Sequence, residues 1–170
     1  MQPDISKAEK WFEDQNWKAF AFQKETWRSY LQGKSGLLNA PTGSGKTYAV
    51  WLGCVLEAMQ SPREAKGLQI IWVTPLRALA KDICAAMNRV NDDLNLGWNI
   101  ALRTGDTSQA ERQRQKRKMP QTIVTTPESI HILLSQADAK KTFGNVKAVI
   151  VDEWHELIGG KRGVQMELAM

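Results

Sequence analysis

Apolar positions along the chain alternate between short continuous runs and helical spacing, which predicts strands and helices in turn. Four apolar runs predict strands at residues 68–73, 99–102, 122–125 and 146–151. Between the runs, apolar side chains recur every three or four residues, as at Leu79, Ile83 and Met87, which predicts helices. The last run is apolar apart from Lys147, so we expect a strand buried on both faces. Strands that alternate with helices predict an α/β fold with a mainly parallel β-sheet flanked by helices.

The N-terminal third adds two helices and a further strand. Ser6 and Glu9 have the spacing of a capping box before an aromatic pair, which predicts a short helix with Ser6 as its cap. A second helix is expected to begin near Gln23. Residues 36–40 predict a short buried strand that leads into a glycine-rich turn, and residues 47–58 predict the helix after that turn.

Composition is that of an ordinary globular protein and excludes several other classes. The 170 residues, 42% hydrophobic and 24% charged, are enough to bury the core of one domain. The apolar runs are far shorter than the about 20 residues of a membrane span, and no secretion signal is recognised, so we expect a cytoplasmic protein without a membrane partner. Cys54 and Cys84 lack disulfide or zinc-ligand spacing. A net charge of +5 permits an anionic partner without identifying one.

Residues 40–47, Ala-Pro-Thr-Gly-Ser-Gly-Lys-Thr, match a phosphate-binding loop in which Ala40 replaces the first glycine. Backbone N–H groups of such a loop surround nucleotide phosphates at the start of the next helix. We expect Lys46 to reach the β- and γ-phosphates and the Thr47 hydroxyl to bind Mg²⁺. A plain glycine turn is the structural alternative, but it would not need Lys-Thr at the helix start. The nucleotide-binding residues expected here are Thr42, Gly43, Ser44, Gly45, Lys46 and Thr47.

The apolar run at residues 146–151 ends in two acidic residues, Asp152 and Glu153. Ligands of α/β proteins bind at the carboxyl ends of the strands, where these carboxylates are expected. Asp152 would hold Mg²⁺ through water, and Glu153 would orient and deprotonate the water that attacks the γ-phosphate. An acidic pair that caps a helix is the alternative, but the phosphate-loop residue Lys46 favours the catalytic interpretation.

His155 completes the motif Asp-Glu-Trp-His, and Phe20-Ala-Phe-Gln23 stands upstream. With these motifs the chain resembles the first motor domain of a superfamily 2 DExH-box helicase. Residues 152–165 are most similar to the Lhr (large helicase-related) branch, which includes relatives linked to bacterial DNA-repair ligases. The resemblance covers nearly the whole chain. It implies a RecA-like phosphate-loop domain, ATP and Mg²⁺ as cofactors, a catalytic role for His155 and a nucleoid-associated location.

The resemblance also assigns Gln23 to adenine recognition, which suits a carboxamide that can donate to N7 and accept from the N6 amino group. Trp17, Phe20 and Phe22 are candidates for stacking on the base, with a place in the core as the alternative for each.

Three further segments resemble nucleic-acid contact motifs of the family, each after a predicted strand: residues 74–82 (motif Ia), 103–106 (motif Ic) and 125–129 (motif Ib). Hydroxyls and helix-start N–H groups at such places contact phosphates and carry no base-sequence information. An ordinary helix start is the alternative for motif Ib. The contact residues expected are Thr74, Pro75, Arg77, Thr104, Gly105, Asp106, Thr126, Pro127, Glu128 and Ser129.

The basic run at residues 112–118 predicts a charged helix. It either adds sequence-independent attraction for phosphates or forms a solvated helix face.

In the family, a motif III strand follows the acidic motif, and the resemblance places it in the sheet between the phosphate-loop strand and the strand before Asp152. No such segment is found up to Met170. We therefore expect residues 1–170 to be a C-terminally incomplete first RecA-like domain, separated from a second motor domain that supplies further arginines. Alone, it should bind nucleotide weakly and hydrolyse it negligibly, and its incomplete sheet favours self-association.

These observations favour an ATP-dependent motor on single-stranded or partly duplex nucleic acid. DNA and a role in repair are favoured because the Lhr-like relatives are DNA translocases. A non-catalytic fragment that binds nucleotide or nucleic acid is one alternative. Another phosphate-loop enzyme, such as a small kinase or a GTPase, is a second, although the chain lacks an Asn-Lys-x-Asp guanine signature.

Overall fold

The computed structural model describes residues 3–60, 66–157 and 164. The chain divides into two compact units, and the boundary falls within helix α4 (Arg77–Asp93). None of the helices in these described ranges is long and apolar enough to cross a membrane. The first unit is Met1–Glu64 with Ala86–Gly97, and the second is Ala65–Ala85 with Trp98–Met170.

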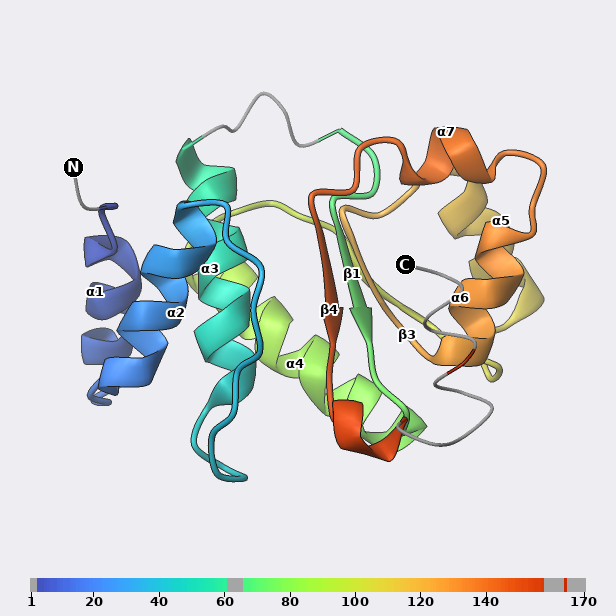
Figure 1. Cartoon of the computed structure of the whole chain (residues 1–170). Helices are drawn as coiled ribbons and strands as arrows, with labels where there is room; N and C mark the ends of the chain where they lie inside the picture. Colours follow the sequence, from blue (N-terminus) through green and yellow to red (C-terminus); the bar gives the residue numbers. More distant parts are fainter. Residues whose placement is uncertain (1–2, 61–65, 158–163, 165–170) are drawn as a thin grey trace. The chain divides into compact units, whose positions relative to one another are not determined.

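The first unit contains the helices α1 (Ser6–Asp14), α2 (Ala21–Leu31) and α3 (Lys46–Gln60). Helix α2 packs along α3, as Figure 1 shows. Their core is aromatic: Trp27 and Trp51 are fully buried. This packing against α2 holds helix α3, which begins at the end of the phosphate loop.

The second unit is built on a four-stranded parallel sheet with the strand order β2-β3-β1-β4 (Figure 1). Helices connect the strands, so the predicted α/β architecture is confirmed. The strands are β1 (Ile70–Val73), β2 (Ile100–Arg103), β3 (Thr122–Thr125) and β4 (Ala148–Val151). The helices are α5 (Gln109–Arg117), α6 (Pro127–Leu134), α7 (Ala139–Phe143) and the 3₁₀ turn η2 (Trp154–Glu156).

The central strands β1 and β3 are buried along their whole length. Trp72 of β1 is 2% exposed. Helix α6 and Leu157, the residue after η2, pack with the sheet in one apolar cluster. That cluster consists of Leu68, Ile71, Val73, Ile123, Ile130, Leu133 and Leu157.

The predicted capping box at the first helix is wrong. Ser6 is the first residue of α1, and the cap position is Ile5, which makes no side-chain bond. Instead, the Asp4 carboxylate accepts the N–H of Ser6 at 2.9 Å. The hydrogen bonds from Ser6 lower the pKa of Asp4, because they stabilise its ionised form. A carboxylate at a helix start meets the same unsatisfied N–H groups and the favourable dipole.

Two predictions about strand burial are also wrong. Residues 36–40 form no strand, and Leu37 is 84% exposed. In β4, which has β1 as its only neighbour among the described strands, Val149 is 47% exposed. A strand is stabilised by the ladder of a neighbouring strand, and a strand at a sheet edge keeps one side open. An apolar run alone does not determine whether such a neighbour is present.

Candidate nucleotide and nucleic-acid sites

The phosphate-binding loop has the backbone that its glycines predict. Gly43 and Gly45 have left-handed backbone angles, with φ of 77° and 81°, which residues with a Cβ rarely adopt. Helix α3 begins immediately afterwards at Lys46. Free backbone N–H groups at a helix start form an anion site, so the geometry suits a phosphate group.

Side chains of the loop bond to its own backbone. The Lys46 ammonium donates to the carbonyl oxygens of Ala40 at 2.9 Å and Pro41 at 3.3 Å. The Ser44 hydroxyl also donates to Pro41, at 2.7 Å. Thr42 is exposed and Thr47 is half-buried at the first turn of α3. The Lys46 ammonium therefore lies at the loop. A bound phosphate oxygen would replace these carbonyl oxygens as its hydrogen-bond partner.

Gln23 is buried beneath this loop, at 1% exposure. Its amide nitrogen donates to the carbonyls of Ser44 at 3.3 Å and Gly45 at 3.2 Å. Its amide oxygen accepts the N–H of Phe20 at 2.9 Å, which caps α2. Sequence reasoning missed these contacts with the phosphate loop, because the two segments lie more than twenty positions apart. Adenine recognition by Gln23 stays a prediction.

The three candidate stacking residues have different surroundings. Trp17 is 41% exposed, and its ring packs against Trp11 at 5.9 Å, with the Arg89 guanidinium 5.1 Å from its centre. Phe20 and Phe22 stack on one another with ring centres 5.9 Å apart and planes 12° apart. Phe20 is 58% exposed and so offers the most open ring face of the three.

In the second unit, all four strands end in register. Arg103 pairs with Thr125, Thr125 with Val73, and Val73 with Val151. Because the strands are parallel, the segments that follow them lie together at the carboxyl edge of the sheet. Sheet register therefore brings together the segments predicted as motifs Ia, Ib and Ic and the acidic motif, all within this unit.

The acidic motif begins directly at the end of β4. The Asp152 N–H extends the sheet by donating to the Val73 carbonyl at 2.8 Å, and its carboxylate accepts the N–H of Glu153 at 2.9 Å. Glu153 has a left-handed backbone, with φ of 48°. His155 lies between two carboxylates, 3.4 Å from Glu153 and 3.5 Å from Glu156. Residues 158–163 and 165 of the motif segment lie outside the described residues.

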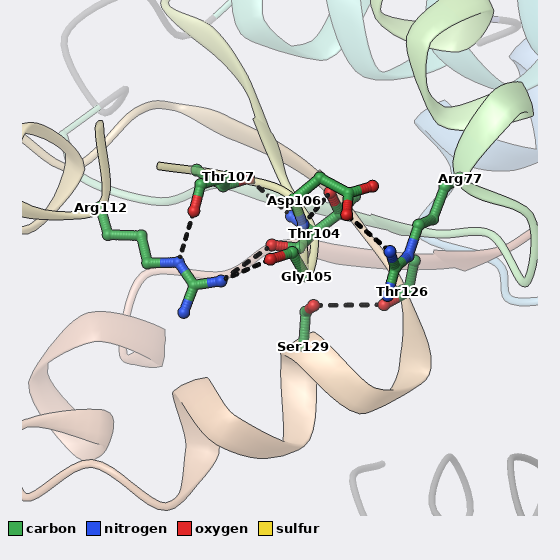
Figure 2. Close-up of polar contacts among 8 residues, drawn as sticks. All are labelled: Arg77, Thr104, Gly105, Asp106, Thr107, Arg112, Thr126 and Ser129. Atoms are coloured by element: carbon green, nitrogen blue, oxygen red, sulfur yellow. Dashed lines mark hydrogen bonds and ion pairs between the residues drawn. The ribbon is translucent and has the colours of Figure 1, made fainter. Parts of the chain in front are cut away.

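Arg77 and Asp106 join the predicted motifs Ia and Ic (Figure 2). Their side chains form an ion pair at 2.7 Å, although both are mostly exposed. Gly105 lies close to the Arg77 side chain: a Cβ added at Gly105 would lie 2.6 Å from a guanidinium nitrogen of Arg77. The Thr104 hydroxyl accepts the N–H of Asp106 at 3.3 Å.

The remaining predicted contact residues lie deeper. Thr126 and Ser129 are buried and hydrogen-bond through their hydroxyls at 3.2 Å, at the start of α6 (Figure 2). Thr74 and Pro75 are buried, Pro127 begins α6, and Glu128 is half-buried. The most exposed predicted groups on this edge are therefore Arg77, Gly105 and Asp106.

Arg112 is a residue of this site that the sequence did not single out. Its guanidinium bonds to three carbonyl oxygens of the loop after β2, in residues Thr104, Gly105 and Thr107. Burial, and after it the positive charge of Arg112, lower the pKa of the neighbouring Arg103. The only available signal was its place in the basic run at 112–118, which did not distinguish it from the exposed charges beside it.

No cluster of three or more His, Cys, Asp or Glu side chains suited to a metal occurs among the described residues. The predicted Mg²⁺ ligands are instead the Thr47 hydroxyl and the Asp152 carboxylate, one in each unit. Both are hard oxygen donors. Each donor by itself suits Mg²⁺, which takes few protein ligands and otherwise binds water and substrate phosphates, and both assignments stay predictions.

Comparisons with known proteins all relate this chain to helicases. A family model described as DEAD/DEAH box helicase matches residues 20–170. The Lhr helicase/uracil glycosylase of Escherichia coli (strain K12) is 33% identical over 167 residues, which cover 88% of this chain. The same match covers 11% of that protein, so the chain spans about a ninth of this relative's length. The predicted resemblance to Lhr helicases is thus confirmed.

Two solved structures support the fold. The helicase Lhr of Mycobacterium smegmatis, bound to ssDNA and AMP-PNP, matches with a TM-score of 0.77 and 32% identity over 95% of this chain and 22% of that chain. Mss116p, bound to ssRNA and AMP-PNP, matches with a TM-score of 0.82 over 97% of this chain and 34% of that chain. At 20% identity the second match concerns the fold alone. The predicted RecA-like fold is confirmed.

Proposed function

Because the chain belongs to the DEAD/DEAH box helicase family, we propose that it is the first ATP-binding motor domain of a longer DNA helicase or translocase. The observation that carries the proposal is the phosphate loop, where two left-handed glycines lead directly into Lys46 and helix α3. This backbone is suited to a phosphate group. Membership of the helicase family indicates that the nucleotide is ATP.

The motif residues have separate roles in the proposed ATP hydrolysis. Lys46 binds the β- and γ-phosphates, and Glu153 orients and deprotonates the attacking water. His155, within 3.5 Å of two carboxylates, positions the Glu153 side chain. Thr47 and Asp152 would hold Mg²⁺, which neutralises charge on the phosphates when it is bound.

The carboxyl edge of the second unit's sheet is the proposed nucleic-acid site. Arg77 and the helix-start groups at Thr126 and Ser129 would contact phosphates of one strand without base-sequence readout. We favour DNA because the M. smegmatis relative is bound to ssDNA. The E. coli relative is named for a helicase and a uracil glycosylase, and this pairing supports a role in repair, at the nucleoid.

The first test is a thermal melt with and without excess Mg·ATP. A ligand of the native state at 100 times its dissociation constant adds about 2.7 kcal/mol of apparent stability. We expect this shift in the natural chain and in the control Lys34→Ala, which removes an exposed lysine of the same unit. We expect no shift in Lys46→Ala. An equal shift in Lys46→Ala would contradict nucleotide binding at the phosphate loop.

The second test compares labelled single strands of DNA and RNA with the same sequence. Tighter binding of DNA, weakened by Arg77→Gln, is the expected result. Equal binding would contradict the preference for DNA, and unchanged binding by Arg77→Gln would contradict the proposed location. Nucleotide and nucleic-acid binding without any turnover, even with the rest of the protein present, would favour the alternative of a non-catalytic binding module.

A further inference from the structure

The loop after β2, residues 104–107, is held by hydrogen bonds between Thr104 and Thr107 and by one guanidinium that the proposed function does not use. Nε of Arg112 donates to the Thr107 carbonyl at 2.9 Å, and Nη2 donates to the carbonyls of Thr104 at 3.2 Å and Gly105 at 3.0 Å. Figure 2 shows this side chain directed from α5 toward the loop. A rigid planar fork that bonds three carbonyls of four successive residues fixes the directions of their peptide groups.

These bonds determine which groups of the loop face outward. In a trans peptide the N–H points opposite the C=O, so the Gly105 N–H points away from Arg112 when the Thr104 carbonyl points toward it. The next N–H, of Asp106, is already bonded to the Thr104 hydroxyl at 3.3 Å. Gly105 is exposed, so this peptide orientation favours an N–H that faces solvent as a hydrogen-bond donor.

The positive charge of Arg112 also favours an anion at the Gly105 N–H. Neighbouring carboxylates pair with other cations: Asp106 with Arg77 at 2.7 Å, and Glu111 with Arg114 at 3.0 Å. Within the described ranges, the hydrogen bonds of Arg112 all go to neutral carbonyls, so its positive charge is not neutralised at the loop. An outward N–H beside an uncompensated positive charge is suited to an anionic oxygen.

We propose that Arg112 is a positioning residue for nucleic-acid binding, which holds the loop after β2 so that the Gly105 N–H meets a backbone phosphate. This role rests on the nucleic-acid site proposed above. Direct phosphate binding by Arg112 is the competing role, and it is disfavoured because two of its three guanidinium nitrogens already bond to the loop. A lysine at this position would keep the charge but lose the fork.

The test compares Arg112→Lys with Arg117→Gln in binding of a fluorescein-labelled oligothymidylate. Arg117→Gln removes an exposed charge from the same helix and is the control for charge loss. We expect Arg112→Lys to bind about tenfold more weakly, as for loss of a charge-assisted hydrogen-bond set. Its salt dependence should equal that of the natural chain, because the count of positive charges is unchanged.

A second measurement follows amide hydrogen exchange of residues 104–107, with Val124 in the buried strand β3 as internal control. We expect faster exchange in the loop of Arg112→Lys and no change at Val124. This result would show that the loop is loosened while the fold is kept. Binding by Arg112→Lys equal to that of the natural chain overturns the role of Arg112 alone. A natural chain that binds no oligothymidylate overturns the proposed nucleic-acid function and this role with it.

Discussion

The phosphate loop and the loop after β2 both present backbone N–H groups, but different interactions hold their shapes. The phosphate loop depends on backbone conformation, with left-handed glycines at positions 43 and 45. The loop at residues 104–107 contains no left-handed residue. It is held by one backbone bond from Thr107 to Thr104 and by side-chain bonds, three of which come from the guanidinium of Arg112. Glycine substitutions should therefore damage the first loop, and loss of the Arg112 guanidinium should affect the second.

The largest effect expected from this comparison is that of Gly45→Ala. Left-handed strain at a residue with a Cβ costs about 1–3 kcal/mol. The new Cβ would also lie 2.8 Å from the Gln23 amide nitrogen, which bonds to this loop. We expect about 3 kcal/mol of destabilisation, from strain and the lost hydrogen bond together, and loss of the Mg·ATP shift.

The matched control is Gly43→Ala, which has the same backbone strain but no atom within 4 Å of the new Cβ. Denaturant unfolding should give a loss of about 1 kcal/mol for this variant. Equal losses for the two alanine variants would mean that the contact with Gln23 has no energetic role.

Gln23→Ala gives the next largest effect. This change leaves the loop glycines in place but removes a buried amide that bonds to Ser44, Gly45 and Phe20. The loss of these partly buried hydrogen bonds costs about 1–3 kcal/mol. Urea unfolding measures this loss, and Gln60→Ala at the exposed end of α3 is the neutral control. An unchanged midpoint for Gln23→Ala would indicate that the loop needs no support from α2.

The two cysteines allow a comparison of helices α3 and α4. Burial raises the pKa of Cys54 in α3 to about 12 and that of Cys84 in α4 to about 11, from 9.0. Both helices therefore retain neutral thiols, and Cys54, at 1% exposure, should react with iodoacetamide more slowly than the half-buried Cys84. Mass spectrometry after timed labelling measures the order of reaction, and faster labelling of Cys54 would contradict the buried packing of α3.

The same pKa shift predicts the pH dependence of stability. A thiol with a raised pKa in the fold contributes its full stability below pH 9, where both states are neutral. That contribution falls as the pH rises from about 9 toward the folded pKa of about 12, because only the unfolded thiol ionises. Chemical unfolding at pH 8 and pH 10 should show a smaller decrease for Cys54→Ala than for the natural chain.

The smallest effects are expected in the loop after β2. Gly105→Ala strains no left-handed backbone and displaces only the end of Arg77, so unfolding should change by less than about 1 kcal/mol. Asp106→Asn removes the exposed partner of Arg77 and should also change stability little. It should instead tighten oligothymidylate binding at low salt, because Arg77 becomes free for phosphate. A large loss of stability in either variant would contradict the side-chain mechanism for this loop.

Much of the fold was predictable from the sequence because local patterns carry it. The run at residues 122–125 matches β3 to the residue, and the alternation of strands and helices predicts the parallel sheet. The errors occur where a local pattern depends on a distant neighbour. Residues 36–40 are apolar enough for a strand but have no strand partner in the described sheet, and Val149 is exposed at the sheet edge.

The sequence by itself determined the phosphate loop, because eight consecutive residues contain both its glycines and its lysine. It also determined the acidic pair after an apolar strand. Only the tertiary structure decided that Gln23 lies under the phosphate loop and that Arg112, among several basic neighbours, bonds to the loop after β2. Backbone conformation depends on the residue at each position, whereas a side-chain bond depends on where packing places residues that are separate in sequence.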